Sequence, residues 1–213
     1  FRPERMIAAY SQGIFPWMVY SGEPVWFSPD PRMVLEPKKL HMPRSLAKIV
    51  RRGDFEVRVD TAFADVMKQC SLVKRPGQRG SWITRRYMDG LNELHAMGMA
   101  HSVEAWRGGE LVGGLYGLAI GRAFFGESMF ALQPDASKVA FVSFVRELAA
   151  AGVELVDCQQ ETEHLARFGA EAWPRPRFLS ALAVAAAKPG RVGRWSIEGE
   201  PWDGRIDGWP FVE

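Results

Sequence analysis

Residues 101–130 read HSVEAWRGGELVGGLYGLAIGRAFFGESMF, and this stretch decides the fold. Its first six residues alternate between polar and apolar, residues 110–120 form a glycine-studded apolar run, and residues 123–130 form another. Two short turns, RGG at 107–109 and IGR at 120–122, separate the three runs. Runs of this length that are joined by tight glycine turns predict an antiparallel meander of three strands.

A helix and a fourth strand are expected after the meander. Apolar side chains recur at helical spacing from Ala136 to Ala151, Asp135 is placed to cap this helix, and Gly152 ends it. The apolar segment VELVDC at 153–158 then predicts a buried strand. The order strand, strand, strand, helix, strand predicts an α/β (α+β) fold, in which helices flank a mostly antiparallel sheet.

The segments on either side carry weaker signals. Residues 4–12 predict a short helix that ends at Gly13, and residues 85–97 predict a longer one. Between residues 14 and 31, prolines and aromatic pairs predict ordered loops that pack on the rest of the chain. The segment after Lys188 is rich in Gly, Trp and Pro, so we expect an appended tail there.

The composition is that of a folded protein. Of the 213 residues, 47% are hydrophobic and 24% are charged, which excludes a wholly disordered chain. The longest weakly charged run, at 178–187, is about half of the roughly 20 residues that a membrane-spanning helix needs. No export leader is recognisable, and Cys70 and Cys158 lack the spacing of a disulfide framework or a zinc site. We therefore expect the protein to work in a reducing cytoplasm.

Charge is distributed unevenly along the chain, although the net charge is only +2. Residues 32–86 hold 14 Lys or Arg and 5 Asp or Glu, whereas residues 87–213 hold 11 and 17. A basic segment of this kind can bind a phosphate backbone, or it can form an ordinary solvated surface. The spacing of the residues does not separate these two interpretations.

Three polar residues near apolar segments are candidates for chemistry. Asp157 and Gln159 bracket Cys158 at a strand end, so the two-residue period predicts that they share a face and that Cys158 points away. A carboxylate beside an amide can hold and deprotonate an amine, but a strand-end Asp can equally cap the next turn. Glu127 lies within FFGESMF and must reach water or find partners, because burying an unpaired carboxylate is costly.

Aromatic residues near basic ones suggest contacts with nucleobases. Trp17 in IFPWM and Trp82 in GSWIT can stack on bases, with core packing as the alternative. The glycines of 113–121 do not follow the order GxGxxG, and the sequence has no P-loop, HExxH or GxSxG motif. The four histidines are scattered, so we expect no metal, and we do not expect Cys158 to act as a nucleophile.

Several distinctive strings occur along the chain in one order. They are GIFPW at 13–17, WFSPDPR at 26–32, WITR at 82–85, AHSVE at 100–104, LVGGLYG at 111–117, FFGESMF at 124–130 and LVDCQ at 155–159. Together they resemble the leucyl/phenylalanyl-tRNA protein transferase family from Met6 to about Ala183. The resemblance implies an acyltransferase-like fold of the GNAT type. It also implies transfer of Leu or Phe, with Met as a further candidate, from charged tRNA to the α-amine of proteins that begin with Arg or Lys, which marks them for N-end rule degradation.

The resemblance assigns roles to individual residues. It implies that Asp157 and Gln159 contact the acceptor amine and that Glu127 is the third polar member of this catalytic site. The aminoacyl-adenosine end of the tRNA would contact Trp17, Trp82 and an apolar side-chain pocket. The residues implied for this pocket are Leu115, Phe124, Met129, Phe144 and Val156. The residues implied for contact with the rest of the tRNA are Arg44, Arg51 and Arg52.

The resemblance also implies a domain division and a mechanism. We expect a remnant of a small N-terminal domain at 1–32, a GNAT-like catalytic domain at 33–187 and a tail at 188–213. Because the donor is an activated ester, positioning is the main task and no cofactor is expected. Gln159 would orient the amine, and Asp157 would polarise Gln159 or relay a proton. We expect a monomer whose partners are aminoacyl-tRNA and acceptor proteins, with no membrane association.

Two other functions stay open. A coenzyme-A-dependent N-acetyltransferase has the same fold, but it needs a Q/RxxGxG/A turn before the helix at Ala136, and SMFALQPDAS lacks that turn. A non-catalytic RNA-binding module would explain the basic segment and would leave the three polar candidates without a role. Transfer from charged tRNA to a peptide, with acetyl-CoA as the rival donor, separates the three functions.

Overall fold

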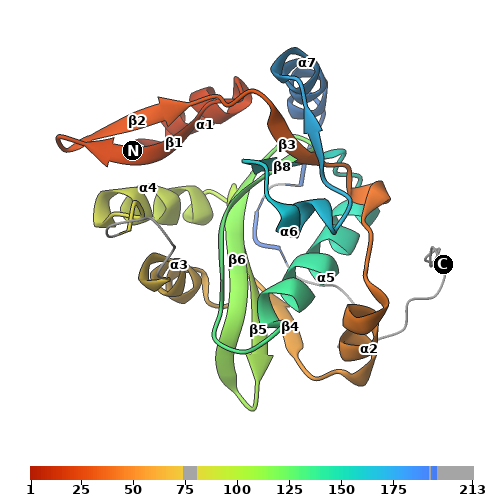
Figure 1. The fold of residues 1–213 in the computed structure, drawn as a ribbon. Coiled ribbons are helices and arrows are strands. Elements are labelled where there is room, and N and C mark those ends of the chain that lie inside the picture. The colour runs from red at the N-terminus through yellow and green to blue at the C-terminus, as the bar shows by residue number, and fades with distance from the viewer. Residues whose placement is uncertain (74–80, 192, 196–213) are drawn as a thin grey trace.

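A computed structural model describes residues 1–73, 81–191 and 193–195. Its centre is a seven-stranded sheet with helices on both faces, and a two-stranded hairpin lies to one side (Figure 1). The strand order in the large sheet is β4-β5-β6-β7-β8-β3-β9. In chain order these strands are β3 (Arg32–Leu35), β4 (Glu56–Val59), β5 (Ala100–Arg107), β6 (Glu110–Ile120), β7 (Ala123–Ala131), β8 (Leu155–Gln159) and β9 (Glu171–Trp173).

The three-strand meander predicted from the sequence is confirmed. β5, β6 and β7 pair antiparallel in chain order, with Leu115 of β6 opposite Val103 on one side and Met129 on the other. The register of β6 and β7 shifts at Gly117, where an added Cβ would lie 2.1 Å from the carbonyl oxygen of Phe125. Glycine at this position therefore allows the two backbones to approach each other closely.

β8 enters the sheet parallel to β7, after the crossover helix α5 (Ala136–Ala150). Phe124 pairs with Val156 in this register, and Phe125 pairs with Asp157. The other neighbouring strands of the described sheet are antiparallel. The fold is mixed α/β, and the prediction of a mostly antiparallel sheet is met only in part, because the strand that carries Asp157 and Gln159 is parallel to its neighbour.

Helices cover both faces of the sheet (Figure 1). α5 packs on the face that carries Val103, Leu115 and Phe124, and α2 packs against α5. The opposite face carries Tyr116 and Phe125 and is covered by α3, α4 and α7, with α1 packed on α4 and α7. The remaining helices are α1 (Pro3–Ser11), η1 (Pro37–Lys39, a 3₁₀ turn), α2 (Arg44–Arg52), α3 (Phe63–Leu72), α4 (Arg85–Ala96), α6 (Glu163–Ala166) and α7 (Arg175–Ala186).

The three helices predicted from the sequence are confirmed within one or two residues at each end. The predicted cap of α5 is wrong, because Asp135 has a φ of 67° and its side chain makes no capping hydrogen bond. Its Oδ1 instead accepts a hydrogen bond from Nζ of Lys138 at 2.7 Å. Across the part of the chain that the structure describes, we find no helix that combines the length and the apolar character needed to cross a bilayer.

The region between residues 14 and 31 was predicted to be loops, but most of it forms a hairpin of β1 (Phe15–Tyr20) and β2 (Glu23–Phe27). Its turn consists of Ser21 and Gly22, with φ values of 50° and 84°. Two successive positive φ values suit the twist of a two-residue hairpin. The prolines that suggested loops are tolerated, because each strand of a two-stranded sheet has one unpaired edge.

The segment after Lys188 packs on the sheet as far as the structure describes it. Trp195 is 9% exposed, and its ring stacks on His101 with the centroids 3.8 Å apart. The backbone N–H of Gly193 donates to the carbonyl oxygen of Gly98. The start of the expected tail is therefore part of the core, whereas residues 196–213 lie outside the described residues.

Candidate active site

Glu127 of β7 is the centre of a buried hydrogen-bond network. Its Oε1 accepts from the hydroxyl of Tyr10 at 2.7 Å and from Nε2 of Gln159 at 2.9 Å. Its Oε2 accepts from the hydroxyl of Tyr87. Helices α1 and α4 supply the two tyrosines, and Glu127 itself is 8% exposed. The prediction that this carboxyl group must find partners is confirmed.

The surroundings of Glu127 shift its ionisation into the neutral range. Burial raises its pKa to about 7 and the charge of Asp157 adds to the rise, while hydrogen bonds from Tyr87, Tyr10 and Gln159 oppose it. Burial and the charge of Glu127 raise the pKa of both tyrosines well above the ordinary value, so both hydroxyls stay protonated and act as donors. A carboxyl group with a pKa near 7 is suited to take up a proton at neutral pH.

Asp157 of β8 is fully buried and forms an ion pair with Arg32 of β3. Nε of Arg32 donates to Oδ1 at 2.7 Å, and Nη2 donates to Oδ2 at 2.6 Å. The guanidinium also lies over the rings of Phe15 and Phe178, 4.7 and 4.5 Å from their centroids. Arg32 therefore belongs to the interior, although its place in the sequence put it in the basic segment.

Asp157 and Gln159 do not share a face of β8. Gln159 has a φ of 64°, and its backbone N–H donates to Oδ1 of Asp157 at 2.9 Å. Asp157 thus caps the turn, which was the alternative that the sequence left open. Cys158 and Gln159 both line a cavity, whereas Asp157 faces Arg32. The predicted shared face is wrong, because the two-residue alternation of a strand ends where a residue adopts the left-handed conformation.

An apolar cavity of about 440 Å³ opens beside Glu127 and Gln159, between α5 and strands β6, β7 and β8. All five residues expected to form a side-chain pocket line it, namely Leu115, Phe124, Met129, Phe144 and Val156. Burial raises the pKa of the Cys158 thiol well above its usual value, so this side chain is a neutral part of the wall. The structure therefore joins the predicted pocket and two of the three predicted catalytic residues in one cavity.

The two predicted stacking residues lie next to each other. The rings of Trp17 and Trp82 are nearly parallel, with an interplanar angle of 8° and centroids 6.4 Å apart. Trp17 lines the cavity, and Trp82 lies 5.2 Å from the ring of Tyr87, which binds Glu127. Both tryptophans are partly buried, so each packs against the core and keeps part of its surface exposed.

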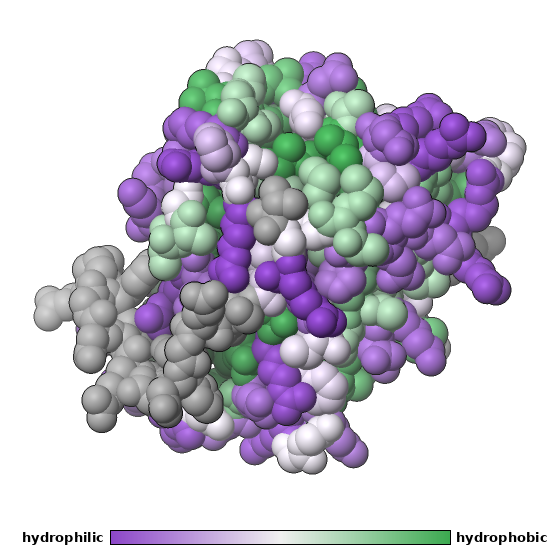
Figure 2. All heavy atoms as spheres, turned by 180° about the vertical axis from the view of Figure 1, so that it is seen from behind, coloured by the Kyte–Doolittle hydropathy of each residue, from purple (hydrophilic) through white to green (hydrophobic). Residues whose placement is uncertain are grey.

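The basic residues expected to contact tRNA are placed on α2. Arg44, Arg51 and Arg52 are exposed, and Arg52 pairs with Asp54 at 2.6 Å. The rear face of the molecule mixes hydrophilic and apolar side chains (Figure 2). Three further basic residues fall within 74–80, outside the described residues. Exposure of α2 fits both a polyanion-binding surface and a solvated one.

Sequence reasoning missed Tyr10, Tyr87 and Arg32 as members of the site. They lie 117, 40 and 125 positions from the acidic residues that they bind. Only Arg32 carries a local signal, since an arginine that begins the apolar strand RMVL needs a buried partner.

The fold and the cavity define a class of protein. An apolar pocket that ends at an acidic group with a pKa near 7 is typical of an enzyme that takes an apolar substrate group. The chain belongs to the leucyl/phenylalanyl-tRNA protein transferase family, as the sequence resemblance predicted. The model of that family matches residues 34–183, and the model of its N-terminal domain matches residues 1–30.

Curated relatives bear the same family name. The leucyl/phenylalanyl-tRNA--protein transferase of Myxococcus xanthus is 62% identical over 92% of this chain and 83% of its own. Those of Anaeromyxobacter sp. strain K and Laribacter hongkongensis are 55% and 48% identical, over 92% of this chain and 84% and 85% of theirs. Among solved structures, L-PGS from Bacillus licheniformis has a TM-score of 0.42 at 12% identity and covers 76% of this chain and 55% of its own. A likeness at that level supports no conclusion.

Proposed function

We propose that this chain transfers Leu or Phe, with Met as a further candidate, from charged tRNA to the N-terminal α-amine of proteins that begin with Arg or Lys. The observation that carries the proposal is that the apolar cavity opens onto Glu127 and Gln159. With its side chain in the cavity, the aminoacyl group would lie next to an amine that is bound at these two residues. Relatives named leucyl/phenylalanyl-tRNA--protein transferase support the same donor for this chain.

In the proposed reaction, the acceptor nitrogen attacks the carbonyl carbon of the aminoacyl ester. The new bond joins nitrogen to that carbon, and the bond from the carbon to the 3′ oxygen of the tRNA breaks. The amine must give up a proton, and Glu127 is placed to receive it because its pKa of about 7 lies near that of an α-amine. Glu127 then gives this proton to the 3′ oxygen, which leaves as a hydroxyl group.

Gln159 and Asp157 have different roles in this proposal. The Nε2 of Gln159 donates to Glu127, so its amide oxygen is the group left to accept a hydrogen bond from the acceptor amine. Both oxygens of Asp157 accept from Arg32, and Oδ1 also accepts from the backbone of Gln159. This geometry favours Asp157 as a positioning residue that holds the turn at Gln159, rather than as a proton relay.

The same proposal covers the pocket and the tRNA. Leu115, Phe124, Met129, Phe144 and Val156 would hold the donor side chain, and Trp17 and Trp82 would contact its adenosine. Arg44, Arg51 and Arg52 would contact phosphates elsewhere on the tRNA, because they are exposed on one helix.

Four further expectations belong to the proposed function. The order of meander, crossover helix and parallel strand supports a fold of the GNAT type. The aminoacylated proteins would enter N-end rule degradation. We expect the reaction to take place in the cytoplasm, because charged tRNA would be its donor. We expect a monomer, which light scattering of the purified chain would test.

The experiment that tests the function is transfer of radiolabelled Phe from Phe-tRNA to a peptide that begins with Arg. Matched peptides begin with Glu or carry an acetylated N-terminus, and acetyl-CoA is offered as the rival donor. We expect label only on the peptide with a free N-terminal Arg. Label from acetyl-CoA, or tRNA binding without transfer, would contradict the proposal.

A further inference from the structure

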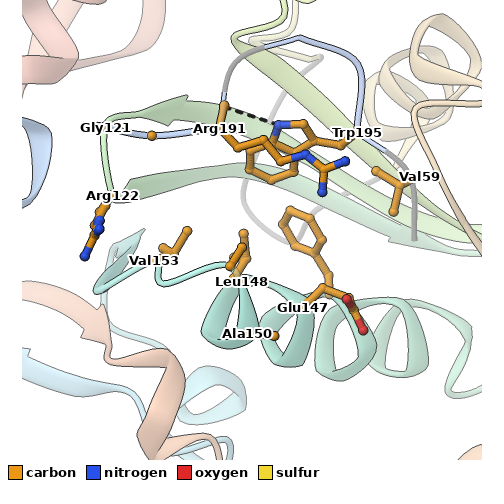
Figure 3. A pocket seen from close by; sticks show the side chains of 12 residues that line it. Val59, Gly121, Arg122, Glu147, Leu148, Ala150, Val153, Arg191 and Trp195 are labelled. Carbon is orange, nitrogen blue, oxygen red and sulfur yellow. Dashed lines mark hydrogen bonds between the residues drawn. The ribbon is translucent and has the colours of Figure 1, made fainter. Parts of the chain in front are cut away.

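A second cavity, of about 200 Å³, lies next to the cavity of the proposed active site (Figure 3). Phe144 and Leu148 of α5 line both cavities, so these two side chains form the wall between them. Val59 and Trp195 are among the other residues that line the second cavity, and Figure 3 shows them on the same side of it. The pocket for the donor side chain thus has hollow space behind part of its wall.

Trp195 lies directly behind this wall. Its ring centroid is 5.9 Å from that of Phe144 and 6.5 Å from that of Phe124. The rings of Phe124 and Phe144 meet edge to face, 4.9 Å apart. The three rings form one cluster, in which Phe124 and Phe144 line the active-site cavity and Trp195 packs behind them.

Contacts outside α5 also hold Trp195 in place. Its backbone N–H donates to Oδ2 of Asp60 at 2.9 Å, and its ring stacks on His101. Its Nε1 donates to the carbonyl oxygen of Arg191 at 3.3 Å, the dashed line in Figure 3. The backbone of Trp195 is thus tied to Asp60, directly after β4, and its ring to His101 of β5.

The chain leading to Trp195 crosses two turns at close range. A Cβ added to Gly190 would lie 2.0 Å from the carbonyl oxygen of Gly121. One added to Gly98 would lie 2.4 Å from Cα of Gly193. Because only glycine allows such close approach, the path of the segment is fixed at two points before it reaches Trp195.

We propose that Trp195 is a positioning residue that sets the depth of the pocket for the donor side chain. This inference rests on the proposed function. With the indole in place, Phe124 and Phe144 are supported on the side that faces Trp195, so the pocket ends at their rings. Without it, the second cavity extends into the space of the indole, so Phe144 can turn into this larger space and the pocket can admit a larger side chain. Trp195 lies beyond residues 34–183, which the family model matches, so the proposal gives a role in specificity to a segment outside the matched range.

The test compares transfer of Leu, Phe and Trp from their tRNAs to one Arg-ended peptide by the full chain and by Trp195→Ala. We expect kcat/KM for Trp relative to Phe to rise by about 10-fold or more in the variant, since small changes in pocket size discriminate by factors of about 10 to 200. Trp195→Phe should return the ratio most of the way to its original value. A purely structural role for Trp195 would lower all three transfers by one factor.

Val59→Ala is the matched control. Val59 lines the second cavity and is buried, but it is not part of the aromatic cluster. We expect it to lower the melting temperature and to leave the Trp to Phe ratio unchanged. If Trp195→Ala does not fold, Trp195→Leu carries the same test, because it also removes the ring.

The outcomes separate this inference from the function on which it rests. An unchanged ratio in a folded Trp195 variant, or an equal shift in Val59→Ala, overturns the inference and leaves the function intact. Failure of the unsubstituted chain to transfer any amino acid overturns the proposed function and the inference with it.

Discussion

The sheet carries two buried polar clusters, and they differ in access to a cavity. The cluster around Glu127 contains Tyr10, Tyr87 and Gln159, and both Glu127 and Gln159 line the cavity of about 440 Å³. The cluster at β4 and β5 contains Asp60, His101, Ser102 and Glu104. None of these four lines either of the two cavities described above.

In the cluster at β4 and β5 the carboxyl groups find hydrogen-bond partners within the fold, whereas Nε2 of His101 is buried without a hydrogen-bond partner among the described residues. Asp60 accepts from the Ser102 backbone at 2.9 Å and from His101 at 2.8 Å, and Glu104 accepts from Thr61 at 2.7 Å. Burial opposes ionisation of Asp60, but the hydrogen bonds from His101 and two backbone N–H groups lower its pKa. Burial raises the pKa of Glu104, against hydrogen bonds from Ser102 and Thr61.

The contrast shows that a buried carboxyl group with a shifted pKa is not in itself a sign of chemistry. Glu104 and Glu127 are both buried and both have a raised pKa. Glu127 borders the cavity of about 440 Å³, which is large enough for a substrate group, whereas Glu104 lines neither of the two cavities described above. Access, rather than burial or ionisation, separates the candidate active site from a structural cluster.

The strongest test removes the two carboxyl groups in turn. Glu127→Gln should lower kcat for Phe transfer by about 10²- to 10⁴-fold, the usual contribution of a group that moves a proton in the reaction. Glu104→Gln is the matched control, and it should leave kcat unchanged while lowering the melting temperature. Equal losses of kcat in both variants would mean that access does not distinguish the clusters.

Asp157→Asn should reduce the free energy of unfolding by about 3–5 kcal/mol, because it leaves the buried guanidinium of Arg32 without its counter-charge. Urea unfolding of the purified variant measures this loss. Asp54→Asn breaks the exposed pair with Arg52 and should cost about 0–1 kcal/mol. Full transfer activity in folded Asp157→Asn would also remove this carboxylate from the mechanism.

The pH dependence of stability should reveal Glu127. Its pKa is about 7 in the folded protein and 4.5 as the ordinary value, so the folded state holds the proton to higher pH. Stability from this group is fully present below about pH 4.5 and is lost as pH rises through 7, a difference of about 3 kcal/mol. Between pH 4.5 and 8, the free energy of unfolding of Glu127→Gln should therefore rise by about 3 kcal/mol relative to that of the unsubstituted chain. A constant difference across this range would contradict the raised pKa.

Asp60→Asn should show the opposite pH dependence and a smaller effect than the loss of Asp157. The lowered pKa of Asp60 means that its stabilising contribution is present above about pH 4 and is lost in acid. The variant should lose about 1–3 kcal/mol of unfolding free energy at pH 7, typical of weakened buried hydrogen bonds. Its kcat for Phe transfer, measured on folded protein, should not change. A large fall in kcat would place this cluster in the mechanism.

Local sequence determined the elements whose signals lie within a short window. The meander of residues 101–130 was predictable because glycine turns and apolar runs are properties of neighbouring residues. The helices α4 and α5 were predictable because a 3.6-residue period needs only one to two dozen residues to be visible. The hairpin at 15–27 was missed, because its prolines mask a turn that Ser21 and Gly22 make possible.

Long-range packing decided the site. The pocket residues were predicted from family resemblance, and the structure gathers them around one cavity. The partners Tyr10, Tyr87 and Arg32 could not be predicted, because hydrogen bonds between residues 40 to 125 positions apart exist only after the layers pack. The direction in which the Gln159 side chain points depends on the positive φ of this residue. The position of Trp195 behind Phe144 depends on glycines in distant turns, where the backbone segments approach each other closely. Sequence by itself determines which local structures can form, whereas burial and pairing, which set a pKa or close a pocket, are properties of the assembled fold.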